Sequence, residues 1–326
     1  MVLYHAVSSY QLLEVMLHRA IYHKKERAVL ILPDFITEKY PQYKTLEEEG
    51  FFEEVYLFPY TRIPHKNEEQ VKAMTLQAYQ QSIPWKLEDF QKIYVAGAHF
   101  YFSLLLINSK QSFVFFEDAA GMLSHPEKLK ENLKKRYPLH SHLAEKYGLF
   151  TGENPCISSI VCLKKAQTIK KFPKPCQDFS VEETLMKLSY AMRKRFIHFF
   201  LKKKIWTRAD TILLTQNFAN LGEMSMEEQT KLYKDMETKM LKKHKVVIKK
   251  HPDDMLDYQG IFPRAKVIRE TFPSELLPYV FWKKPRTICT ITSTGCENLG
   301  KHFTLIIAGD RILPGYLYKA GREEYV

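Results

Sequence analysis

Short apolar runs that end abruptly in polar residues recur along this chain, and the clearest is the segment VVIKKHP at residues 246–252. An apolar run of this length, closed by a histidine and a rigid proline, is typical of a buried strand that stops at His251 and Pro252. Open α/β sheets bind their ligands outside the carboxyl ends of such strands. The segment therefore predicts a parallel-sheet fold and makes His251 a candidate phosphate ligand or acid.

The first half of the chain alternates between strand-like and helix-like patterns. Apolar runs short enough for buried strands are separated by segments in which apolar residues have a helical spacing. This alternation predicts a βαβ opening and a doubly wound sheet. The expected strands are 2–7, 28–32, 94–96 and 113–116, and the expected helices are 10–23 and 100–107.

The second half repeats the alternation after a stretch rich in lysine and proline, residues 164–175, which we interpret as a linker or exposed loop. Residues 180–183 and 225–228 both have the Ser-x-x-Glu spacing of a capping box, so a helix is expected to start at each. The first of these helices is expected to run toward Lys204. The expected strands are 211–215, 246–250, 266–269 and 286–292.

These patterns predict an α/β protein with two Rossmann-like domains. Its 326 residues, of which 45% are hydrophobic, are enough to bury two cores. The expected division is an N-terminal domain over residues 1–178, a linking helix over 179–205 and a C-terminal domain over 206–326. The last helix or tail of the C-terminal domain can cross back to the first domain.

The chain is strongly basic, with a formal net charge of +12. Such a charge predicts an anionic partner, which can be nucleic acid, an acidic membrane surface or a phosphorylated substrate. The five cysteines have neither CxxC pairing nor zinc-site spacing, so we expect free thiols in a reducing compartment and no metal site. Because the start of the chain lacks a secretory pattern and no apolar run is long enough to span a membrane, a soluble or peripheral cytoplasmic protein is expected.

Two acidic residues, Glu117 and Asp118, directly follow an expected buried strand in the first half of the chain. A carboxylate at this position can act as a general base if burial or a like-charged neighbour brings its pKa near the working pH. The alternative is an acid that merely caps a turn or helix. The sequence alone leaves both interpretations open.

Three polar clusters follow expected strands or turns in the second half. Thr215 and Gln216 close one strand, and Glu275 follows a Phe-Pro-Ser turn. Ser293 and Thr294 lie where a strand gives way to a helix, and hydroxyl and free N–H groups at such a junction can bind a phosphate. A simple helix N-cap would have the same residues.

Two adjacent acids, Asp253 and Asp254, follow the His-Pro pair. Without a third acidic ligand nearby, we expect them to cap the next helix rather than to bind a metal ion. The glycine-rich motifs of dinucleotide enzymes and P-loop NTPases, and the GxSxG elbow of hydrolases, are absent from the sequence.

The order of these clusters resembles that of bacterial sialyltransferases, in particular lipooligosaccharide sialyltransferases and capsule polysialyltransferases. The resemblance extends over residues 2–300 and implies a GT-B fold, in which two Rossmann-like domains face each other across a cleft. The matching segments are Ser8 to Leu13 at the entry to the first helix, Glu117-Asp118, Thr215-Gln216, Lys250-His251-Pro252, Pro273-Ser274-Glu275 and Ser293-Thr294.

By this resemblance, the reaction is an inverting, metal-independent transfer of sialic acid from CMP-sialic acid to a hydroxyl of a cell-surface glycan, without a cofactor. Asp118 or Glu117 would deprotonate the acceptor, with Asp118 favoured, and His251 would stabilise or protonate the CMP phosphate as it leaves. Glu275 would hold the ribose. The full set of donor-binding residues implied is Thr215, Gln216, Lys250, Pro252, Glu275, Ser293 and Thr294.

The sequence departs from the family pattern at two places. Ala119 and Ala120 separate the paired acids from Gly121, whereas the family has glycine directly after the acids, and this leaves the choice between Glu117 and Asp118 open. Asn217 stands where these enzymes often have proline. The second departure puts the identity of the donor in doubt.

Two other functions stay open on the sequence. The donor can be CDP-glycerol or a CMP-linked keto sugar, because the same groups suit those phosphates. A non-catalytic nucleic-acid-binding protein would also explain the charge, but the chain has no zinc-finger, RRM or KH signature. We therefore expect no nucleic acid partner.

A basic segment, residues 193–204, allows peripheral attachment to the inner face of an anionic membrane, where lipid-linked acceptors are assembled. In this interpretation Phe196, Phe199, Phe200 and Trp206 contact the membrane. The alternative is a solvated helix face whose aromatic residues point into the core.

Overall fold

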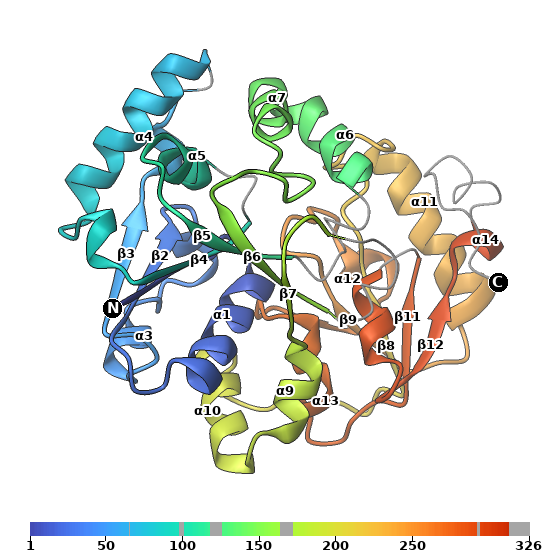
Figure 1. The fold of residues 1–326 in the computed structure, drawn as a ribbon. Helices are drawn as coiled ribbons and strands as arrows, with labels where there is room; N and C mark the ends of the chain where they lie inside the picture. The colour runs from blue at the N-terminus through green and yellow to red at the C-terminus, as the bar shows by residue number, and fades with distance from the viewer. Residues whose placement is uncertain (65, 98–100, 118–125, 164–171, 292–293, 313–326) are drawn as a thin grey trace. The chain divides into compact units, whose positions relative to one another are not determined.

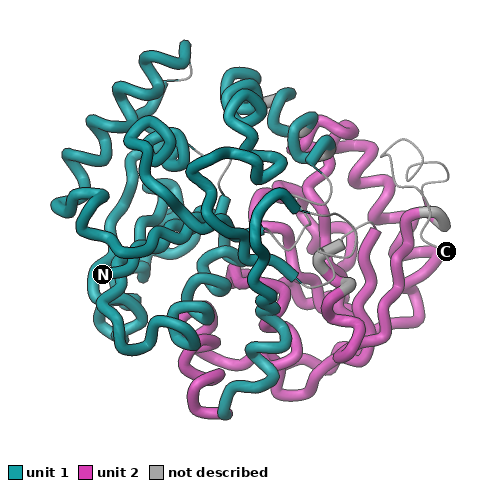
Figure 2. The backbone as a smooth tube through the Cα atoms, in the orientation of Figure 1, with its two compact units in different colours: residues 1–189 teal, residues 190–326 magenta. Residues whose placement is uncertain are grey.

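The computed structural model describes residues 1–64, 66–97, 101–117, 126–163, 172–291 and 294–312. The chain divides into two compact units, residues 1–189 and residues 190–326 (Figure 2). The boundary between the units therefore lies between Ser189 and Tyr190, whereas the sequence suggested limits at 178 and 206.

The expected single linking helix is two helices, α9 (Val181–Lys187) and α10 (Tyr190–Phe200). Leu188 has an extended backbone (φ −65°, ψ 144°), which interrupts the helical hydrogen bonds between them. The apolar spacing continues across this break, and for this reason the sequence pattern did not reveal it. Ser180 caps α9 as predicted, because its side chain accepts a hydrogen bond from the Glu183 N–H.

Unit 1 contains, in its described residues, a seven-stranded parallel sheet with strand order β3-β2-β1-β4-β5-β6-β7 (Figure 1). This order reverses direction between β1 and β4, as in doubly wound folds. The strands are β1 (Val2–His5), β2 (Ala28–Pro33), β3 (Glu54–Phe58), β4 (Lys92–Ala96), β5 (Phe113–Phe116), β6 (Ile157–Cys162) and β7 (Cys176–Asp178).

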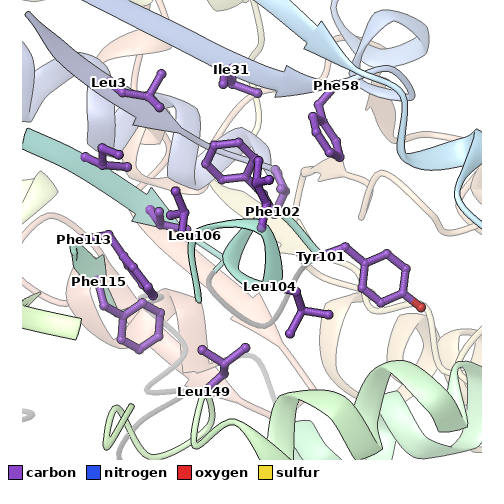
Figure 3. Close-up of a cluster of buried hydrophobic side chains, with 14 of the residues drawn as sticks. Leu3, Ile31, Phe58, Tyr101, Phe102, Leu104, Leu106, Phe113, Phe115 and Leu149 are labelled. Carbon is purple, nitrogen blue, oxygen red and sulfur yellow. The ribbon is translucent and has the colours of Figure 1, made fainter. Parts of the chain in front are cut away.

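Helices cover both faces of this sheet. Alternate strand residues such as Leu3 and Phe115 pack with α5 in one core cluster, which Figure 3 shows. On the other face, the His18 ring of α1 lies against the rings of Tyr4 and Tyr94. The helices of unit 1 are α1 (Ser9–Tyr22), α2 (Ile36–Lys39), α3 (Thr45–Glu48), α4 (Glu68–Ser82), α5 (Tyr101–Asn108), α6 (Pro126–Arg136), α7 (Pro138–Lys146) and α9.

His5, the last residue of β1, is fully buried in this core. Its Nδ1 donates to the carbonyl of Ala96 (3.1 Å), so its Nε2 accepts from the hydroxyl of Tyr60 (2.8 Å). The ring also stacks on Phe102, with 4.7 Å between centroids. Burial lowers the pKa of His5 to about 3, which keeps the ring neutral. This strand-end histidine is therefore part of the packing of unit 1.

Unit 2 contains, where the structure describes it, a five-stranded parallel sheet with strand order β10-β9-β8-β11-β12. Both units thus share the order 3-2-1-4-5 over five strands, which is the Rossmann arrangement. The strands are β8 (Thr211–Leu214), β9 (Val246–Lys249), β10 (Lys266–Ile268), β11 (Thr287–Thr290) and β12 (Thr304–Ile307). The helices are α10, α11 (Met226–Met236), α12 (Tyr258–Ile261), α13 (Leu277–Val280) and α14 (Gly309–Ile312), with a π-helical turn at Glu237–Leu241.

The predicted capping box at the start of α11 is present. The Ser225 side chain accepts from the Glu228 N–H, and the Glu228 carboxylate accepts from the Ser225 N–H. The five cysteines are free thiols, as expected. Across the described part of the chain, no helix combines the length and apolarity needed to span a membrane.

Candidate active site

Five of the predicted residues of unit 2 follow the carboxyl ends of β8 and β9, namely Thr215, Gln216, Lys250, His251 and Pro252. These strands are neighbours, with Leu214 paired to Lys249, so the residues that follow them, Thr215 and Lys250, emerge side by side. The backbone N–H of His251 donates to the Thr215 hydroxyl (3.0 Å). β8 borders the point where the strand order reverses, which is where open α/β sheets bind ligands.

Asp254, which is buried, is the centre of the hydrogen-bond network at this edge of the sheet. Its Oδ2 accepts from the hydroxyls of Thr215 (2.8 Å) and Tyr258 (2.6 Å). Its Oδ1 accepts from the Gln229 amide (3.0 Å) and from the Leu256 N–H (3.1 Å). These four donors stabilise a buried carboxylate. Asp254 thereby ties the loop after β9 to both β8 and α11.

The expectation that Asp253 and Asp254 cap the next helix is wrong. That helix, α12, has Asp257 as its N-cap, whose side chain accepts from the Gln259 N–H. Asp254 instead points inward, because Thr215 and Gln229, distant in the sequence, donate hydrogen bonds to it. Asp253 is exposed. In the described residues, no group of three His, Cys, Asp or Glu residues is arranged to hold a metal ion.

The His251 side chain is 40% exposed, in contrast to that of His5. Its Nδ1 accepts a hydrogen bond from the Asp253 N–H (3.2 Å) and lies 4.0 Å from the Asp253 carboxylate. Because Nδ1 accepts, the neutral ring carries its proton at Nε2. An imidazole held in this way can donate a hydrogen bond, or a proton when it is charged, to a phosphate oxygen.

Lys250 and Pro252 complete the turn around His251. The Lys250 ammonium donates to the Leu256 carbonyl (3.0 Å) and lies 5.8 Å from the centroid of the Tyr258 ring. Pro252 is exposed. Lys250 therefore closes the loop from 250 to 258 and adds a positive charge next to His251.

A buried pair of oppositely charged residues, Glu275 and Lys249, also lies at this sheet edge, and only Glu275 was predicted from the sequence. Glu275 is buried in the 3₁₀ turn Ser274–Leu276. Lys249, the last residue of β9, is also buried, and its ammonium lies 4.9 Å from the centroid of the Phe272 ring. Burial lowers the pKa of Lys249 to about 8, while the negative charge of Glu275 opposes this shift. The sequence signal for Lys249 was its position at the end of an apolar run.

The remaining predicted residues belong to both units. Glu117 lies in unit 1, directly after β5, where it is buried and its N–H donates to the Val161 carbonyl (2.8 Å). In unit 2 the Gln216 N–H donates to the Tyr233 hydroxyl (2.8 Å). Asp118, Ser293 and the side chain of Thr294 lie outside the described residues.

Comparison with known proteins identifies related sequences and folds. The model of glycosyltransferase family 52 matches residues 24–304. An uncharacterised protein of Haemophilus influenzae is 38% identical over 114 residues, which are 35% of this chain and 36% of that protein. The chain thus matches just over a third of the length of that relative.

Solved structures share the fold at low sequence identity. The UDP-GlcNAc 2-epimerase of Neisseria meningitidis, bound to UDP-GlcNAc, has a TM-score of 0.54 and 16% identity, covering 90% of this chain and 78% of the epimerase. UGT2 of Phytolacca americana has a TM-score of 0.50 and 13% identity, covering 98% of this chain and 84% of UGT2. At these identities the likeness concerns the fold alone.

Proposed function

Because the chain belongs to glycosyltransferase family 52, we propose that it transfers sialic acid from CMP-sialic acid to a hydroxyl of a cell-surface glycan, with inversion and without a metal ion. The resemblance to the bacterial sialyltransferase family is confirmed, and the protein is a glycosyltransferase of the GT-B class with two Rossmann-like units. This family assignment replaces the interpretation as a non-catalytic nucleic-acid-binding protein.

The observation that carries the proposal is the network from Asp254 through Thr215 to His251. It fixes the backbone and the Nδ1 atom of a partly exposed histidine at the carboxyl edge of a Rossmann-like sheet. Donors that are already oriented stabilise the charge that develops on a leaving phosphate more than they stabilise the ground state. Such an arrangement suits a nucleoside monophosphate as the leaving group.

In the proposed reaction, an acceptor hydroxyl attacks the anomeric carbon of sialic acid while the bond from that carbon to the CMP phosphate oxygen breaks. A carboxylate, Asp118 or Glu117, takes the hydroxyl proton. His251 donates a hydrogen bond from its Nε2–H to the phosphate oxygen that receives the electron pair, which stabilises the departing CMP. Thr215 acts as a positioning residue, because its hydroxyl already donates to Asp254 and accepts from the His251 N–H.

The remaining predicted residues are proposed to bind the donor. Lys250 contributes positive charge beside the phosphate, and Pro252 fixes the turn that presents His251. Glu275 would hold the ribose, with Lys249 as the neighbouring cation. Gln216, Ser293 and Thr294 complete the proposed donor site.

Variants at the paired acids test the reaction and identify the base. We expect Asp118→Asn to lower the transfer rate by about 100-fold or more and to leave CMP affinity unchanged, because a general base acts on the acceptor. Glu117→Gln serves as the matched comparison and should have the smaller effect. Initial rates with CMP-sialic acid and a sugar acceptor, together with calorimetric CMP binding, measure both. Near wild-type turnover in both variants would exclude this pair as the source of the base.

We also propose that the acceptor is lipid-linked and that the enzyme works in the cytoplasm, attached to the inner face of the cell membrane. The net charge of +12 supports attraction to an anionic surface.

A further inference from the structure

Two exposed tryptophans lie on adjacent chain segments of unit 2. Ile205 and Phe281 form a parallel bridge, and the Trp282 N–H donates to the Ile205 carbonyl (3.1 Å). Ile205 and Phe281 are buried, so the residues that follow them point outward. The exposed fractions of Trp206 and Trp282 are 61% and 72%. Side chains of this size are normally buried.

A basic side chain lies over each of these two rings. The Lys204 ammonium lies 5.7 Å from the centroid of the Trp282 ring, and the Arg208 guanidinium lies 5.4 Å from that of Trp206. Residues 202–208 and 282–284 contain no acid. We call this set the tryptophan–lysine surface, and its members, all exposed, are Lys202, Lys203, Lys204, Trp206, Arg208, Trp282 and Lys283.

A small basic cavity of about 220 Å³ adjoins this surface. Lys203, Lys204, Lys266 and Arg269 line it, with Glu270 as the single acid. The Lys266 ammonium donates to the backbone carbonyl of Trp206 (2.9 Å), which places the cavity next to the chain segment that carries this tryptophan. Four cations against one carboxylate favour an anionic ligand.

The aromatic residues of α10 do not take part in this surface. Phe196, Phe199 and Phe200 are buried, so the idea that they contact a membrane is wrong, and the core-facing interpretation holds for them. Their helical spacing puts them on one face of α10, and that face packs inward. Trp206, which follows the helix, is the exposed member of the original group.

We propose that the tryptophan–lysine surface binds an anionic phospholipid bilayer, with both indole rings at the headgroup level and a lipid phosphate in the adjoining basic cavity. Tryptophan is enriched where an apolar ring and an N–H group meet a membrane–water interface. Clustered lysines bind anionic lipid surfaces through their charge. Neighbouring indoles set among unmatched cations fit a fluid anionic surface, which requires no shape complementarity. This inference rests on the membrane attachment proposed above and names the surface responsible for it, and its test is separate from the transferase reaction because vesicle binding requires neither donor nor acceptor.

Vesicle flotation with the full-length protein tests the proposal. We expect binding to vesicles of phosphatidylcholine with phosphatidylglycerol and little binding to phosphatidylcholine alone. The triple variant Lys202→Gln, Lys203→Gln, Lys204→Gln should weaken binding by about 100-fold, because each lysine near the surface contributes to the attraction. The matched control is Lys242→Gln, Lys243→Gln, Lys245→Gln, which removes the same charge from equally exposed lysines of unit 2.

A tryptophan variant tests insertion separately from charge. In the wild type, vesicles should shift the tryptophan emission to shorter wavelengths, and Trp206→Ala with Trp282→Ala should abolish that shift. Met255→Ala, at another exposed apolar side chain of unit 2, is the control and should keep it. Thermal unfolding midpoints establish that the variants are folded.

The proposal is overturned if both lysine variants bind vesicles equally, or if the wild type binds none. Capture of a short RNA that depends on Lys202 to Lys204, without vesicle binding, would assign the surface to nucleic acid instead. No sugar donor is present in these assays, so a negative result in them does not bear on the proposed transferase activity. Likewise, a protein that shows no transfer of sialic acid can still bind vesicles.

Discussion

Replacing His251 with alanine is expected to lower the transfer rate by about 100-fold or more while the protein stays folded. The imidazole is 40% exposed, so its removal costs little buried surface, whereas the leaving phosphate loses a positioned donor. Steady-state rates and the thermal unfolding midpoint measure the two effects. A large fall in the rate with an unchanged midpoint is the expected combination.

His244→Ala is the matched control for this variant. The His244 side chain is 39% exposed and its Nδ1 lies 2.9 Å from the Asp210 carboxylate, but it precedes β9 and so lies at the opposite end of the strand from His251. We expect this variant to retain nearly full activity. Equal losses in both variants, or full activity in His251→Ala, would contradict the role given to His251.

Asp254→Asn is expected to destabilise unit 2 by about 3 kcal/mol and to weaken CMP binding. The carboxylate accepts four hydrogen bonds, and an amide would place an N–H group against at least one of these donors. The loop that carries His251 would then be held to Thr215 by the His251 N–H alone. Urea unfolding and calorimetric titration with CMP measure the two effects.

The neighbouring acid provides the comparison for Asp254. Asp253 is exposed, and Asp253→Asn should change the free energy of unfolding by about 0.5 kcal/mol or less. Thr215→Val removes the hydroxyl between Asp254 and the His251 N–H, and it should weaken CMP binding as Asp254→Asn does. An Asp254→Asn protein as stable as the wild type would show that the network does not hold the loop.

Most of the strands that begin each half of the chain were predicted from their apolar runs. The expected strand at 28–32 corresponds to β2, and the expected strand at 113–116 is β5. β7, with the sequence CQD, was not predicted, because it has no apolar pattern and forms by pairing with β6. β3, β6 and β12 were missed as well, although each contains apolar residues (EVYLF, ISSIVC and TLII). Tertiary pairing, rather than local pattern, decides such strands.

The two strand-end histidines show why the site was only partly predictable. Both His5 and His251 follow apolar runs, so local sequence does not distinguish them. Tyr60 and Phe102, distant in the sequence, bury His5, whereas His251 remains accessible. The role of Asp254 was hidden for the same reason, because its partners include residues 25 and 39 positions earlier in the chain.

Calorimetric titration of the protein with CMP, CDP and UDP, repeated with His251→Ala, tests the central claim most directly. It requires no knowledge of the acceptor and reports on the site at the carboxyl ends of β8 and β9. We predict that CMP binds more tightly than CDP or UDP, and that His251→Ala weakens CMP by about 10-fold or more, the effect of one hydrogen bond to a charged phosphate. Tighter binding of CDP, or CMP affinity unchanged in His251→Ala, would contradict a CMP-sugar site at His251.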